Sequence, residues 1–188
     1  MPQIQTIQPA APDPLVAGLL VLAAAQQLTL SAGETFRDTL PEGSTELAAC
    51  LRGPLTLCFP DGEAEIPAGG LALLTVPGSF QLCAAEECQC ALLCLSGELP
   101  GRILLPEPPC ALYPQGAAAV RETMTTLSIL DREGSGLDAP TASGYAYTLL
   151  MKLLRLKETE PSRYSPLIEA AIGIIDDEFA YLEGLDDL

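Results

Sequence analysis

Residues 46–97, ELAACLRGPLTLCFPDGEAEIPAGGLALLTVPGSFQLCAAEECQCALLCLSG, decide the fold of this chain. Short apolar segments in this stretch, such as 47–51, 55–59, 71–76 and 90–95, each end at a turn rich in Gly or Pro. Evenly spaced short strands separated by such turns are typical of antiparallel sandwiches and barrels. We therefore predict a mainly β core.

The spacing of apolar residues changes after the proline-rich stretch 106–114. Helical spacing of apolar residues begins near Arg121, runs to about Arg132 and resumes from about Thr141 to Glu158. The second of these segments carries an apolar stripe formed by Ala146, Leu149, Leu150, Leu153 and Leu156. We therefore expect the β core to be followed by C-terminal helices.

The net charge and the absence of histidine argue against several classes of function. Acidic residues outnumber basic ones 25 to 9, and the resulting net charge of -16 repels the phosphate backbone of DNA. Histidine is absent, which removes the commonest metal ligand and the commonest general base at neutral pH. These residues alone are not expected to bind nucleic acid, to hold a metal or cofactor, or to act as an enzyme.

The apolar run Leu15–Ala25 resembles the hydrophobic part of an export signal but is not preceded by the basic residues of such a signal. No Lys or Arg precedes it, since the first basic residue is Arg37, and it is shorter than the roughly 20 residues that cross a bilayer. We therefore expect a cytoplasmic protein with no membrane partner. Its seven cysteines are expected to be free thiols.

Two stretches resemble a known family. Residues 46–97 are similar to the cupin-type sensing barrel of bacterial AraC-type transcription regulators, with strands around the Pro60-Asp61-Gly62 turn and the Val76-Pro77-Gly78 corner. The tail SPLIEAAIGIIDDEFAYLEGLDDL, residues 165–188, resembles the entry to the DNA-binding domain of that family. The resemblance implies a cupin-like, double-stranded β-helix or jelly-roll barrel that binds a small-molecule effector. It also implies a helical homodimerisation segment and a helix-turn-helix domain truncated at Leu188.

On this basis we divide the chain into four parts. Residues 1–26 are expected to form an N-terminal arm and a first strand or short helix, and residues 27–118 the sensing barrel. Residues 119–160 would form the helical dimerisation region. Residues 161–188 would form a linker helix and the start of the helix-turn-helix domain, so that DNA is contacted only through the missing C-terminal domain.

The barrel differs from enzymatic cupins at one informative place. Those enzymes hold a metal with histidines and a carboxylate, and the second histidine motif would fall just after Pro77-Gly78. Here that place holds Ser79, Phe80 and Gln81. We therefore expect a metal-free binding module, while a stand-alone cupin binding protein and a cupin isomerase or dioxygenase remain the alternatives.

Arg37, Arg52 and Arg102 are the cations of the predicted barrel segment. An arginine that faces inward can form bidentate hydrogen bonds with a carboxylate or phosphate ligand. An arginine on the surface instead balances the negative charge of nearby acidic residues. Arg37 is favoured because in AraC-type regulators the strand after the arm often supplies a ligand contact. The predicted ligand-binding residues are Arg37, Arg52, Phe80 and Gln81.

Two further sets allow more than one interpretation. The leucines 149, 150, 153 and 156 either pack the helix on its own barrel or form a dimer interface, and a wide stripe allows both. We assign them to the homodimer interface. The second set is Cys88, Cys90 and Cys94, which share one face of a predicted strand. They are either small buried side chains of the barrel wall or thiols that sense redox state or bind a metal.

Overall fold

The computed structural model describes residues 2–9, 18–104, 110–132 and 137–158 of the chain. The chain divides into two units, Met1–Lys157 and Glu158–Leu188. The linker helix and helix-turn-helix start that we expected at 161–188 lie outside the described residues.

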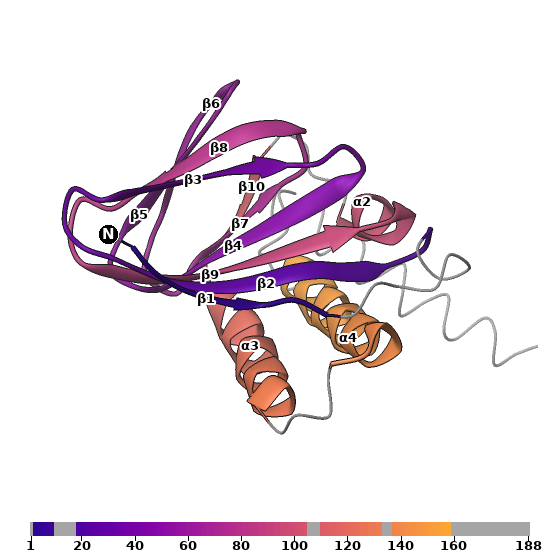
Figure 1. Ribbon diagram of the computed structural model, residues 1–188. Helices are drawn as coiled ribbons and strands as arrows, with labels where there is room; N and C mark the ends of the chain where they lie inside the picture. The colour runs from indigo at the N-terminus through magenta and orange to yellow at the C-terminus, as the bar shows by residue number, and fades with distance from the viewer. Residues whose placement is uncertain (1, 10–17, 105–109, 133–136, 159–188) are drawn as a thin grey trace, which may run out of the picture. The chain divides into compact units, whose positions relative to one another are not determined.

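The described strands form two antiparallel sheets (Figure 1). The larger sheet has the order β1 (Gln3–Ile7), β2 (Val21–Leu30), β9 (Cys88–Ser96), β4 (Ser44–Arg52), β7 (Leu71–Leu74) and β10 (Cys110–Tyr113). The smaller sheet has the order β3 (Thr35–Leu40), β8 (Gly78–Cys83), β5 (Leu55–Phe59) and β6 (Gly62–Ile66). The described helices are α2 (Glu98–Leu104), α3 (Ala117–Arg132) and α4 (Ala139–Glu158).

The strand order is that of a jelly roll. Strands β2, β9, β4 and β7 lie side by side in the larger sheet, and β3, β8, β5 and β6 form the smaller one. These eight strands are two facing four-stranded sheets joined by long crossovers, the arrangement of a double-sheet jelly roll. Strands β1 and β10 extend the larger sheet at its two edges. The predicted fold, a mainly β, cupin-like barrel followed by helices, is confirmed.

The larger sheet is buried on both faces. In β9, Cys90 and Leu92 point toward the smaller sheet and belong to the barrel core. Leu93 and Leu95 point the other way, into a second core shared with α3 and α4, which lie against this sheet in Figure 1. Burial on both faces explains why β9 reads as a nearly continuous apolar run rather than as an alternating one.

Gly53 shows how tightly the turn between β4 and β5 is built. Its backbone φ of 75° lies in the left-handed region. A Cβ at this position would sit 2.6 Å from the backbone oxygen of Glu87. Both the conformation and the close approach therefore require glycine.

The N-terminal region differs from the expected arm. Gln3–Ile7 is a strand paired with β2, and Ile7 is fully buried in the core shared with the helices. The ambiguous apolar run continues into β2, which crosses the boundary that we placed between residues 26 and 27. Sequence patterning missed β1 because its two isoleucines, Ile4 and Ile7, are three residues apart and do not alternate as in a half-buried strand.

Helix α4 packs on its own sheet. The side chains of Leu149, Leu150 and Leu153 have 0% exposed surface, and Leu156 is partly buried against the same core. Of the two roles considered for this stripe, the structure shows the intramolecular one. The three fully buried leucines have no exposed surface for a second subunit, so their assignment to the homodimer interface is corrected to packing within the chain. Dimerisation itself stays a prediction.

No helix in the described part of the chain is both long and apolar enough to cross a membrane.

Candidate ligand-binding groove

The inside of the barrel is a packed apolar core. Its largest buried side chains come from both sheets and include Leu28, Leu30, Leu57 and Leu82. Phe80 points into this core and is only 3% exposed. Its neighbour Gln81 is on the opposite face of β8, because successive strand residues alternate. The predicted ligand residues therefore do not share the barrel interior.

Arg37 also faces outward. It is exposed on β3, whereas Leu40 of the same strand is buried in the barrel core. Arg37 lies directly opposite Gln81 in the pairing of β3 with β8, and its Nε donates a hydrogen bond of 3.0 Å to Gln81 Oε1. Our expectation of an arginine inside the barrel is corrected by this strand parity.

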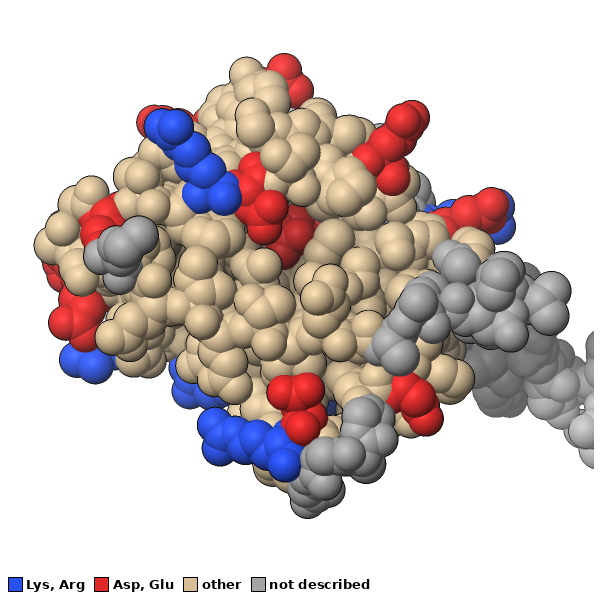
Figure 2. Space-filling model, viewed as in Figure 1, with Lys and Arg blue, Asp and Glu red and all other residues tan. Residues whose placement is uncertain are grey.

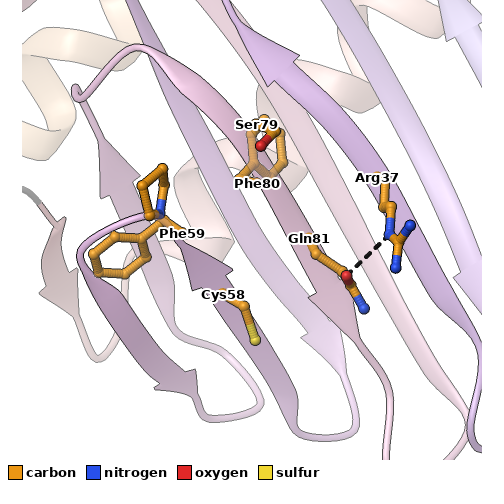
Figure 3. A pocket seen from close by; sticks show the side chains of 7 residues that line it. Arg37, Cys58, Phe59, Ser79, Phe80 and Gln81 are labelled. Carbon is orange, nitrogen blue, oxygen red and sulfur yellow. Dashed lines mark hydrogen bonds between the residues drawn. The ribbon is translucent and has the colours of Figure 1, made fainter.

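These residues instead line a groove on the smaller sheet, with a volume of about 560 Å³ (Figure 3). Strands β3, β8 and β5 supply its lining, which consists of Arg37, Cys58, Phe59, Pro60, Ser79, Phe80 and Gln81. The groove combines one guanidinium, a side-chain amide, a hydroxyl and a thiol with the partly exposed Phe59 and a proline, while the ring of Phe80 is buried beneath it. Such a mixture of apolar contact surface and a few polar groups is typical of small-molecule sites.

The chemistry of the groove suits an anion. Arg37 uses its Nε to bond Gln81, and within the described part of the chain its terminal N–H groups have no further hydrogen bond or ion pair. A guanidinium oriented in this way presents a planar fork that matches a carboxylate or phosphate. Gln81 therefore acts as a side chain that positions Arg37.

The other two arginines lie elsewhere. Arg52 is exposed at the end of β4, opposite Gln89, and does not line the groove. Arg102 is exposed on α2 and forms an ion pair of 2.7 Å with Glu98. The structure thus brings Arg37 and Gln81 together in the groove, places the ring of Phe80 in the barrel core beneath it, and separates Arg52 from all three.

Sequence reasoning missed a carboxyl group inside the barrel. Glu46 on β4 is only 6% exposed and shares strand parity with Ala48 and Cys50, which face the barrel core. Its pKa is raised to about 8, first by burial and then by the nearby charge of Asp38 on β3. Figure 2 shows acidic atoms set back in a hollow on this face of the molecule. No alternation along β4 could have located Glu46, because this strand is buried on both faces.

Cys88 and Cys90 are buried in the barrel core, and Cys94 packs against it from the same face. The predicted common face of these cysteines is confirmed. Burial also raises the pKa of Cys94, to about 12, and that of Cys50, which lies opposite Cys90, to about 11. Within the described ranges, no three His, Cys, Asp or Glu residues are grouped as metal ligands.

Comparisons with known proteins add structural neighbours only. No family model matches the chain, and no curated protein matches it. Similar solved structures include the protein YhaK from Escherichia coli, with 19% identity over 58% of this chain and 50% of that one and a TM-score of 0.47. An HTH_3 family transcriptional regulator from Vibrio cholerae has 17% identity over 52% of this chain and 51% of that one, with a TM-score of 0.41.

A cupin superfamily protein from Desulfitobacterium hafniense has 14% identity over 50% of this chain and 76% of that one, with a TM-score of 0.35. The matched region spans half of YhaK and about half of the Vibrio regulator. With identities and TM-scores this low, the fold assignment rests on the strand order of the chain itself. That order makes the chain a cupin-like jelly-roll protein followed by helices.

Proposed function

We propose that the chain is the effector-sensing and dimerisation portion of an AraC-type transcription regulator. In this proposal a small molecule bound by a metal-free jelly roll controls a C-terminal helix-turn-helix domain. The observation that supports a sensing role is the groove, which Arg37, oriented by Gln81, lines together with Phe59 and Pro60. The AraC assignment itself rests on the resemblance of residues 46–97 and 165–188 to that family.

The groove favours an effector that carries a carboxylate or phosphate on an apolar body. Arg37 would pair with the anionic group, while Phe59 and Pro60 would contact the apolar part. Because the chain has no histidine and a net charge of -16, the proposed role is ligand binding rather than catalysis or direct contact with DNA.

Binding of aromatic and aliphatic carboxylates to the full chain, followed by calorimetry or thermal shift, tests the groove. Arg37→Gln should weaken binding roughly 10- to 100-fold, since hydrogen bonds to charged groups contribute about 1.5–3 kcal/mol. Arg102→Gln removes a matched exposed charge on α2 and should leave affinity unchanged. Equal affinity in the wild type and in Arg37→Gln would remove the groove as the effector site.

The regulatory part requires the complete gene product. DNA affinity of that protein, measured with and without a carboxylate that binds the wild-type groove, should change in the wild type and not in Arg37→Gln. Ligand binding with no effect on DNA affinity would instead favour the stand-alone binding protein. Sedimentation of the same protein tests the proposed homodimer.

A further inference from the structure

Two thiols lie next to each other on the outer face of the smaller sheet. Cys58 on β5 and Cys83 on β8 are both partly exposed. In the register of these strands, Cys58 is opposite Gln81 and Cys83 is opposite Thr56, so the two cysteines are diagonal neighbours. Both side chains project from the outer face of the smaller sheet, so the two thiols are neighbours on that face.

The pair is connected to the cation of the groove. Gln81 Nε2 donates a hydrogen bond of 3.2 Å to Cys83 Sγ, while Gln81 Oε1 accepts the bond from Arg37 Nε. Figure 3 shows Arg37, Gln81 and Cys58 together in the groove. The amide therefore directs a donor at Cys83 and is itself polarised by the guanidinium.

The two thiols are not equivalent. The pKa of Cys58 is raised, first by burial and then by the neighbouring Cys83 and by Glu63, which lies opposite it on β6. The N–H donor that Gln81 directs at Cys83 Sγ assigns to Cys83 the role of the attacking sulfur and to Cys58 that of the second thiol.

We propose that Cys58 and Cys83 form a peroxide-reactive dithiol site that closes to a reversible disulfide. The sulfur of Cys83 attacks one oxygen of a hydroperoxide, the O–O bond breaks, an alcohol or water leaves, and Cys83 becomes a sulfenic acid. The sulfur of Cys58 then attacks Cys83, the S–O bond breaks, and the hydroxyl group leaves as water with the proton of Cys58. Two thiols lose two electrons in total, and the peroxide gains them.

The diagonal arrangement explains why the disulfide would be reversible. Diagonal neighbours have Cα atoms about 7–8 Å apart, beyond the roughly 4.4–6.8 Å usual for a disulfide. Closing the bond therefore requires a local shift of β5 against β8, and a strained, exposed disulfide is easily reduced. By contrast, Cys88 and Cys90 share one face of β9 but are buried in the barrel core, away from a dissolved oxidant.

The test treats the reduced full chain with hydrogen peroxide and maps cross-linked peptides by mass spectrometry after alkylation. We expect a Cys58–Cys83 peptide that disappears with dithiothreitol. Cys58→Ser should stop at a sulfenic acid on Cys83 that dimedone captures, and Cys83→Ser should form neither product. Cys110→Ser removes a partly exposed thiol from the larger sheet and serves as the matched control.

Peptide mapping of the wild type needs no variant and keeps the test independent of variant folding. A peroxide-induced disulfide that joins other cysteines, or a Cys83 that stays reduced while other thiols oxidise, would overturn the proposal. So would a Cys83→Ser chain that captures dimedone on Cys58. None of these readouts involves the effector, so the dithiol site stands or fails separately from the proposed function.

Discussion

Glu46 is an ionisable group placed inside an otherwise apolar barrel. Its carboxyl faces Asp38 of the opposite sheet and the thiol of Cys94, its direct partner on β9. Removal of a carboxylate from water disfavours its charged form, and the nearby Asp38 adds repulsion. At neutral pH the folded chain therefore holds Glu46 mainly protonated.

This burial predicts a pH-dependent stability. The folded pKa of Glu46, about 8, exceeds its ordinary value of 4.5, so the folded state binds more protons than the unfolded state between these limits. Stability should fall as pH rises through this window, by up to about 1.4 kcal/mol per pH unit, and level off above it. Urea denaturation at a series of pH values across this window and just above it measures the slope and its levelling off.

Glu46→Gln should flatten this profile, because the amide does not titrate. Glu65→Gln provides the control, since Glu65 is an exposed carboxylate on β6. An unchanged slope in Glu46→Gln would mean that another group produces the pH dependence.

At the level of single elements, the sequence predicts some features well and others poorly. Turn spacing in residues 46–97 located β4, β5, β7 and β9, because Gly and Pro turns are local features, but it did not mark β8. The orientation of Arg37 was also available, since Phe36 and Leu40 mark the inward parity of β3. In the larger sheet the sequence does not show which residues face the barrel core, because strands buried on both faces are apolar throughout.

The partner of a helix stripe is not a local property. The spacing of leucines in α4 shows that one face is buried, but a sheet of the same chain and a second subunit satisfy that pattern equally well. The same limit applies to the groove, because Arg37 and Gln81 are 44 residues apart and meet only through the pairing of β3 with β8.

Leu153→Ala tests the packing of α4. Because Leu153 is fully buried against the larger sheet, its truncation should reduce the free energy of unfolding by about 2–5 kcal/mol. Tyr147→Ala on the same helix should have an effect within about 0.5 kcal/mol, since Tyr147 is 49% exposed. A Leu153→Ala chain that keeps its stability and changes only its sedimentation would place this leucine between subunits instead.

In the molecule as a whole, the larger sheet is shared by two cores. The groove lies on the outer face of the smaller sheet, while α3 and α4 pack on the far face of the larger one. Dense packing transmits displacement better than exposed loops do. In the proposed function, ligand-dependent shifts of β3 and β8 would reach the helices through the barrel core and the larger sheet.

The central position of β9 sets the order in which backbone amides should exchange with deuterium. Strand β9 is hydrogen-bonded to β2 on one side and β4 on the other, and its side chains fill both cores. Its amides should open only with the whole domain, whereas β6, at the edge of the smaller sheet, should open locally and exchange far sooner. Exchange measured peptide by peptide checks this gradient, and fast exchange in Cys88–Ser96 would mean that the two cores come apart separately.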